Sequence, residues 1–271
     1  MPSASLTLLV DNGSLAPAAT LGLRALAAAL ATKIGEPVEP VSLLHSSGIA
    51  PEKLGGTPAD ILFPFLEKRV AAGQTDFLIL PLFFGPSGAL TGYIPDQLAR
   101  LQTKHPTLNV RLAPHLHHSD DDRLARILAD HVRAEKPVAG RDRVALVDHG
   151  SPAPAVTIVR NELAAQLATL LGAEVDAVAP CSMERREAAE YDFCEPLLAT
   201  LLGREGWNTS RVIVAMQFLL PGRHAGPSGD VAEICEAAHA AHPQLCTSMT
   251  KLVAEHPLIL DILADRWRAA R

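Results

Sequence analysis

The stretch LLVDNGSLAPAAT at residues 8–20 decides the fold, because it returns as ALVDHGSPAPAVT at residues 145–157. Nine of the thirteen positions are identical at this shift of 137 residues. The chain is therefore a tandem duplication of one unit. Beyond these stretches the match continues at Leu26 and Leu163, Leu30 and Leu167, Gly35 and Gly172 and, at a shift of 135, Phe83 and Phe218.

Each copy alternates short apolar runs with amphipathic segments. In the second copy the helix after the first strand places Val159, Leu163 and Leu167 on one face and stops before Gly172. This alternation is typical of a parallel sheet covered by helices. We predict two tandem α/β domains, residues 1–137 and 138–271, with a linker around 134–143 and a cleft between them. The expected strands lie near residues 6, 38, 77 and 109, and near 144–147, 175–178, 212–218 and 244–249.

Composition excludes several classes of protein. No apolar run approaches the roughly 20 residues that a membrane-spanning helix needs, and the net charge of −6 disfavours a nucleic-acid binder. The first residues lack the pattern of a secretory signal, so we expect a cytoplasmic protein. The four cysteines form no CxxC pair, so no zinc ribbon or iron–sulfur cluster is expected.

The two copies differ at the loops that follow their strands. Asn12 of the first copy corresponds to His149, and the same shift pairs Ser47 with Glu184 after the second strand. After the third strand, the shift of 135 pairs Ala89 with His224. Loops at the carboxyl ends of parallel strands border one crevice, so His149, Glu184 and His224 should converge. Two imidazoles and a carboxylate suit Fe²⁺, Co²⁺, Ni²⁺ or Zn²⁺.

Each of these residues also has a plainer interpretation. His149 could shape the turn between strand and helix, Glu184 could be an exposed carboxylate paired with an arginine, and His224 could be an ordinary loop residue. A serine-hydrolase site is rejected because the G-x-S-x-G motif is absent. The turn at Gly150 and Ser151 could seat an anion on a helix N-terminus, but no G-x-G-x-x-G pattern predicts a nucleotide.

At these residues the sequence resembles the CbiX-type sirohydrochlorin chelatases, a class II family that inserts divalent metal into tetrapyrroles. The resemblance spans both copies, as in the long members of the family, and implies two chelatase-like domains of the flavodoxin or Rossmann type. It is carried by the strand and turn at 146–151, the strand and loop at 214–224, and the segment 79–95.

The resemblance implies that His149 and His224 handle the metal and that Glu184 is the acidic residue. It also implies that the first copy, with Asn12 and Ala89, is degenerate. The reaction then has two substrates. One is the metal, Co²⁺ or Fe²⁺ with Ni²⁺ as a further candidate, and the other is a sirohydrochlorin-like macrocycle. We expect the macrocycle to contact Ser151, Arg185, Arg186, Arg223, Phe83 and Phe218.

Two other functions remain open at this point. A carrier of metal or tetrapyrrole would keep the site without catalysing insertion, and a two-lobed ligand receptor would not depend on His149. The chelatase is the preferred hypothesis. Because one chain holds two copies, we expect a monomer.

Overall fold

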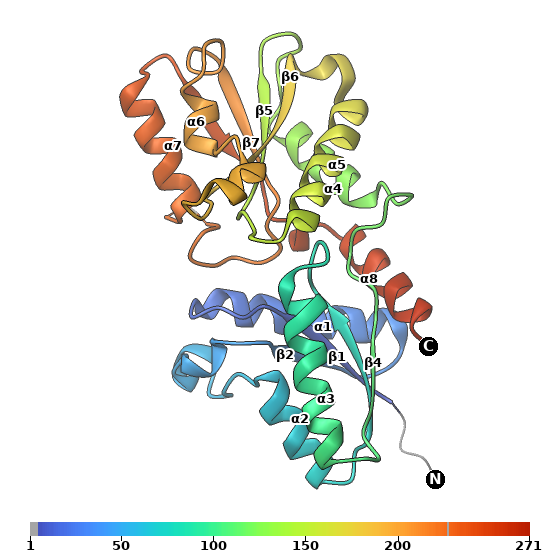
Figure 1. The fold of residues 1–271 in the computed structure, drawn as a ribbon. Helices are drawn as coiled ribbons and strands as arrows, with labels where there is room; N and C mark the ends of the chain where they lie inside the picture. The colour runs from blue at the N-terminus through green and yellow to red at the C-terminus, as the bar shows by residue number, and fades with distance from the viewer. Residues whose placement is uncertain (1–4, 227) are drawn as a thin grey trace. The chain divides into compact units, whose positions relative to one another are not determined.

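The computed structural model describes residues 5–226 and 228–271. Two parallel four-stranded sheets form, with the strand orders β2-β1-β3-β4 and β6-β5-β7-β8 (Figure 1). The predicted tandem α/β fold is confirmed. The strands are β1 (Leu6–Asp11), β2 (Val38–Ser42), β3 (Asp76–Pro81), β4 (Asn109–Leu112), β5 (Arg143–Asp148), β6 (Ala177–Ser182), β7 (Arg211–Met216) and β8 (Cys246–Met249).

The first helix of each repeat begins and ends as its sequence indicates. A proline occupies the first turn of both, where its missing N–H costs nothing. Gly35 ends the earlier one in the left-handed conformation, at φ 74°. The helices are α1 (Pro17–Ile34), α2 (Leu62–Ala71), α3 (Ile94–Lys104), α4 (Arg123–Ala134), α5 (Pro154–Leu171), α6 (Leu198–Leu202), α7 (Asp230–Ala241) and α8 (Leu258–Ala269).

Helices cover both faces of each sheet. In the second sheet, Ala145 and Val147 point toward a core that includes side chains of α6 and α7, and α4 and α5 cover the other face (Figure 1). In the first sheet, Leu8 and Val10 face α2 and α3. On its opposite face lie α1 and α8, where the Trp267 indole donates to the Thr7 hydroxyl at 3.0 Å.

The last helix of each repeat belongs to the other repeat's compact unit. One unit comprises residues 1–116 and 260–271, and the other comprises residues 117–259. Helix α4 is held on α5 through Arg133, which donates to the carbonyl of Leu170 at 2.9 Å and pairs with Glu174, just after α5, at 2.7 Å. Lys33 of α1 pairs with Asp261 of α8 at 2.7 Å. The repeats of the sequence and the compact units of the fold therefore have different bounds.

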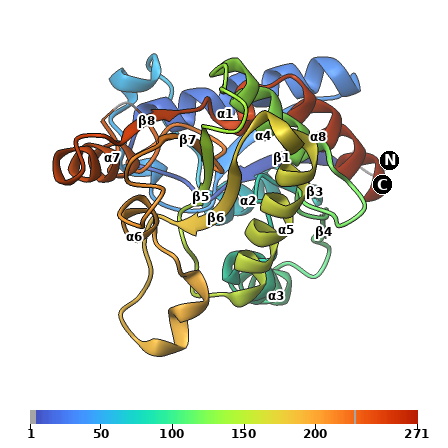
Figure 2. The same ribbon diagram turned by 90° about the horizontal axis from the view of Figure 1, so that it is seen from above.

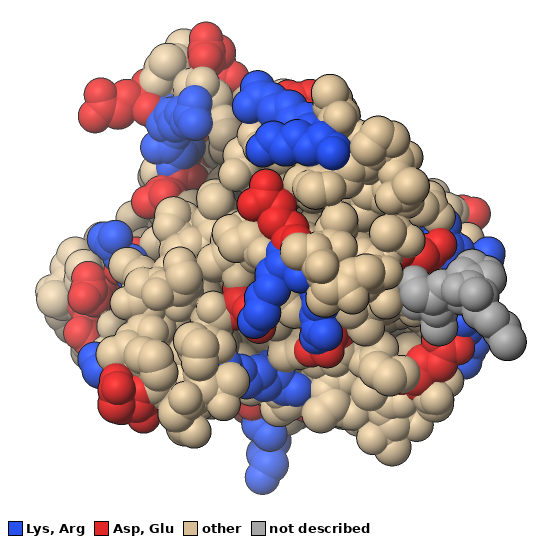
Figure 3. All heavy atoms as spheres, turned by 90° about the horizontal axis from the view of Figure 1, so that it is seen from below, with Lys and Arg blue, Asp and Glu red and all other residues tan. Residues whose placement is uncertain are grey.

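Among the described residues, we find no helix that combines the length and apolarity required to cross a bilayer. On the face shown in Figure 3, basic and acidic side chains are interspersed and do not gather into a basic area.

Candidate metal site

The turn after β5 brings the ends of two strands together. The amide of Glu184 donates to the carbonyl of His149 at 3.2 Å, and the amide of Met183 donates to the carbonyl of Asp148 at 2.7 Å. Gly150 has a φ of 90°, and a Cβ there would lie 1.9 Å from the carbonyl oxygen of Glu184. Only glycine allows this close approach. The backbone thus sets the side chains of His149 and Glu184 next to each other.

A second set of contacts positions His224 in the loop between β7 and α7. Its Nδ1 lies 2.6 Å from Oδ2 of Asp230, the first residue of α7. Its carbonyl accepts from the amide of Val231 at 3.3 Å. Both the ring and the backbone of His224 are therefore tied to the start of one helix.

The three residues converge at the carboxyl end of the second sheet. The imidazole centroids of His149 and His224 are 4.5 Å apart, with an angle of 67° between the rings. Nε2 of His149 lies 3.4 Å from Oε1 of Glu184. All three side chains reach solvent, with exposed fractions of 47% for His149, 58% for Glu184 and 32% for His224. The site is open to an incoming ion.

Hydrogen bonds indicate which ring nitrogen of each histidine can bind a metal. Nδ1 of His149 lies 2.8 Å from the carbonyl oxygen of Gly150, and Nδ1 of His224 faces a carboxylate. Each Nδ1 then carries the proton, which leaves a lone pair on Nε2. When the His149 ring is neutral, that lone pair faces Oε1 of Glu184, and two acceptors then meet without a donor. A cation between them would relieve this repulsion.

Metal binding requires the side chains to move. In the described part of the chain, no three His, Cys, Asp or Glu side chains are already arranged to enclose one metal ion. His149 and Glu184 are about half exposed, so they can change rotamer at small cost. The donor set fits a borderline divalent metal, since imidazole and carboxylate are both common ligands of such ions.

A buried polar network supports the turn from below. The amide of Gly150 and the hydroxyl of Ser182 both donate to Oδ1 of Asp148, at 3.1 and 2.6 Å. Arg160, 1% exposed, donates to Ser182 Oγ at 2.6 Å and to the carbonyl of Cys194 at 2.8 Å. Burial raises the pKa of Asp148, while the Ser182 hydrogen bond and the Arg160 charge oppose that rise.

Sequence reasoning missed Asp230 and Arg160. Asp230 lies six residues after His224, where an acidic residue at a helix start has an ordinary explanation. Arg160 replaces Leu23 at the shift of 137 residues. Comparison of the helices of the two copies, and not only of their loops, could have found it.

The pairing of Glu184 with Ser47 is wrong. The counterpart of Glu184 is Leu44, whose amide donates to the carbonyl of Asn12 at 3.2 Å as Glu184 donates to His149. The reason is a short helical turn, Gly172–Glu174, that precedes β6 in the second copy. It shifts this strand by three further residues relative to the first copy.

The first copy lacks the chemistry of the site at all three tips. Asn12 and Leu44 occupy the first two. At the third, Ala89 begins a helical turn that runs directly into α3, where the second copy has the His224 loop. The carboxyl end of the first sheet therefore offers no imidazole at these positions.

The predicted substrate-contacting arginines differ in their availability. Arg185 is engaged by Glu195 at 2.8 Å and Asp192 at 3.2 Å. Arg186 lies over the ring of Tyr191, 5.3 Å from its centroid. These residues belong to the segment between β6 and α6, which projects from the sheet (Figure 2).

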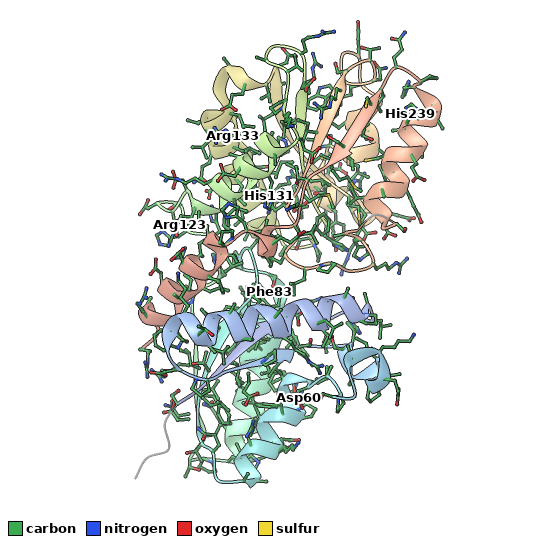
Figure 4. All side chains as sticks on the ribbon, turned by 180° about the vertical axis from the view of Figure 1, so that it is seen from behind. Asp60, Phe83, Arg123, His131, Arg133 and His239 are labelled. Atoms are coloured by element: carbon green, nitrogen blue, oxygen red, sulfur yellow. The ribbon has the colours of Figure 1, made fainter. Side chains whose placement is uncertain are left out.

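The remaining predicted contacts lie in four separate places. Arg223 is 83% exposed beside the metal residues, 3.7 Å from Asp230. Ser151 accepts from the amide of Ala153 at 3.1 Å and so shapes the start of α5. Phe218 and Phe83 are partly buried against the cores of their own units (Phe83 in Figure 4). Of these, Arg223 is the side chain with the most free surface.

Comparison with known proteins gives one family. The family model described as CbiX matches the chain twice, at residues 6–135 and 143–270. No curated protein sequence matches.

Solved structures with the same fold come from the same group of proteins. SirB from Bacillus subtilis with Fe³⁺ shares 18% identity at a TM-score of 0.71, over 99% of this chain and 96% of that one. The sirohydrochlorin chelatase SirB from Bacillus subtilis subspecies spizizenii in complex with cobalt shares 17% at 0.70, over 99% and 95%. CbiX, described as the terminal enzyme of siroheme biosynthesis in denitrifying bacteria, shares 19% at 0.62, over 98% and 99%.

Proposed function

The chain belongs to the CbiX family, and from this premise we propose that it is a sirohydrochlorin chelatase that inserts Co²⁺ or Fe²⁺ into the macrocycle. The observation that carries the proposal is the convergence of His149, His224 and Glu184 in the second repeat. The matched structures include proteins solved with iron and with cobalt, which supports this choice of metals.

The reaction needs metal delivery and proton removal. A divalent ion enters the metal-free macrocycle as two pyrrole protons leave, so no nucleophile or redox step is involved. The Nε2 atoms of His149 and His224 bind the incoming ion, and Asp230 keeps the proton of His224 on Nδ1. Glu184 either completes the metal shell or accepts one of the protons.

Macrocycle binding is assigned to cations and apolar rings near this site. Sirohydrochlorin-like substrates carry several carboxylates, and Arg223 is exposed beside His224 to meet one of them. Arg186 can contribute by leaving Tyr191. Arg185 is a weaker candidate because two carboxylates of its own segment already hold it.

Three further features belong to this proposal. The chain acts as a monomer, since it already contains two repeats. It needs no nucleotide or iron–sulfur cluster, which agrees with metal insertion as an exchange of one ion for two protons. It works in a reducing compartment such as the cytoplasm, since all four of its cysteines are free thiols.

The deciding experiment is optical. Sirohydrochlorin and Co²⁺ or Fe²⁺ are mixed anaerobically with the protein, and the macrocycle absorption is followed over time. We expect a rate above the spontaneous one that falls about 100-fold or more in His149→Ala/His224→Ala. Asn12→Ala, at the matching position of the first repeat, is the control and should leave the rate within about twofold.

Other outcomes would lead to different functions. Tight binding of metal or macrocycle without acceleration would make the protein a carrier and contradict catalysis. If metallation is accelerated, Glu184→Gln separates the two roles proposed for Glu184. An amide oxygen can still ligate a metal but cannot accept a proton at neutral pH.

A further inference from the structure

A cavity of about 160 Å³ lies in the first unit beside β2. The helix α1 lines it with Thr20, Leu23 and Arg24, the strand β2 contributes Ser42, and the loop at residues 57–60 forms its outer rim. Asp60 of that loop is labelled in Figure 4. The cavity is separate from the proposed metal site, which belongs to the second unit.

Polar atoms in and behind this cavity lack partners. Thr20 is 4% exposed, and its hydroxyl has no hydrogen-bond partner. Asp11 is 8% exposed, and its Oδ1 has no partner either. A hydrogen bond joins the Asp11 carboxyl to Ser42, which itself lines the cavity. Buried polar atoms without partners are costly, so this region is built for a group that can donate hydrogen bonds.

The second repeat shows which group fits there. Asp148 and Ser182 are register partners in the second sheet, as Asp11 and Ser42 are in the first. There the guanidinium of Arg160 donates to Ser182 and lies 4.0 Å from Asp148. The position of Arg160 corresponds to Leu23 at the shift of 137 residues. The first repeat keeps the carboxylate and the serine but lacks the cation.

Arg24, the next residue along α1, replaces only half of the Arg160 interactions. It donates to the carbonyl of Pro58 at 2.9 Å, as Arg160 donates to the carbonyl of Cys194. Pro58 and Cys194 hold equivalent positions. Each lies two residues before the residue whose carbonyl accepts from the amide of the strand serine, Ser42 or Ser182. Among the hydrogen bonds and ion pairs of the described residues, Arg24 has none to Asp11 or Ser42. The Ser42 hydroxyl accepts instead from the Ser46 hydroxyl at 2.9 Å, which leaves one lone pair of its oxygen for a further donor.

We propose that the cavity beside Thr20, Leu23 and Ser42 binds a guanidinium group from solution, free or as part of a small molecule. Its N–H groups would donate to the hydroxyls of Thr20 and Ser42, and its charge would neutralise Asp11. Guanidinium N–H groups also suit a site whose free polar atoms are oxygens.

The test is a titration of the full chain with guanidinium chloride up to about 50 mM, against potassium chloride at the same concentrations. Binding to the folded state raises Tm. We expect saturation and a rise of about 2–4 °C in wild type with guanidinium alone. Asp11→Asn should lose the rise, and Leu23→Arg should lose it because it supplies its own guanidinium. Glu52→Gln, an exposed carboxylate outside the cavity, is the control that should keep it.

Thr20→Val is the alternative test variant if Leu23→Arg does not fold. It keeps the shape of the side chain and removes the hydroxyl, so the guanidinium concentration at half-saturation should increase about fivefold or more. An equal rise with potassium, an equal response in Asp11→Asn, or no saturable response in wild type would each overturn the proposal. None of these outcomes bears on metal insertion, which has its own assay.

Discussion

The two repeats share one buried carboxylate and treat it differently. Asp148 of the second repeat accepts from a serine and a glycine amide and has the guanidinium of Arg160 4.0 Å away. Asp11 of the first repeat has Leu23 where that guanidinium would be, and burial raises its pKa to about 6. The repeat that carries the imidazoles is also the one in which a cation compensates the charge of the buried carboxylate. The two repeats therefore differ both in the residues of this turn and in the buried residues that support it.

The largest effect is expected from making the second repeat like the first. Arg160→Leu leaves Asp148 buried beside Ser182 without its cation, and an uncompensated buried charge costs about 3–5 kcal/mol. Urea unfolding should show this loss of stability. The control is Arg126→Ala on α4, where an exposed ion pair with Asp122 contributes at most about 1 kcal/mol. Equal losses in the two variants would contradict the role given to Arg160.

The second prediction concerns Asp11. Burial raises its folded pKa from the ordinary aspartate value of 3.8 to about 6, so the folded state binds the proton more tightly than the unfolded state. Stability contributed by this group is therefore greatest below about pH 4 and declines as the pH rises to about 6. Asp11→Asn removes that decline and should stabilise the protein by up to about 3 kcal/mol at pH 8.

The measurement for Asp11 is urea unfolding of both proteins at pH 4.5 and pH 8. The difference between variant and wild type isolates Asp11 from the other carboxylates. It should be clearly larger at pH 8, and a difference that is the same at both values would refute the assignment. Urea is required, because guanidinium chloride would occupy the proposed cavity.

These comparisons also show what the sequence could predict. The repeat at residues 8–20 and 145–157 predicts two similar sheets, and the parallel order then brings His149 and His224 to one edge. The residues at the loop tips could be predicted from the sequence because the loop after each strand has a defined place in such a fold. Their chemical roles remain a proposal that the metallation assay tests.

Other features could not be read from the repeat. A shared pattern does not say which sheet the last helix of a repeat covers, so the exchange of α4 and α8 was missed. The extra turn at Gly172–Glu174 displaced the alignment of β6 and gave Glu184 the wrong counterpart. Arg160 was overlooked because an arginine within a helix is expected at the surface, whereas this one is 1% exposed.

The third prediction concerns the loop between β7 and α7, where the first repeat has no histidine. Asp230 fixes the ring of His224, so it acts as a positioning residue. Asp230→Asn should weaken Co²⁺ binding and slow metallation about 10- to 100-fold while leaving Tm nearly unchanged. Glu233→Gln, an exposed carboxylate in the first turn of the same helix, controls for the charge near the helix start. Similar losses in both variants would mean that Asp230 acts only through its charge.

The smallest effect is expected at Arg223, which reaches solvent beside His224 and has no counterpart among the tips of the first repeat. If this side chain meets a carboxylate of the macrocycle, Arg223→Ala removes one exposed charge-assisted contact, worth about 1 kcal/mol. The KM for sirohydrochlorin should then increase about three- to tenfold with kcat nearly unchanged, because the contact is present in both the bound substrate and the transition state. Steady-state kinetics at two salt concentrations measures this, since added salt should reduce the gap between variant and wild type. A fall in kcat at constant KM would instead place Arg223 with the reacting centre, next to the metal that His149 and His224 deliver.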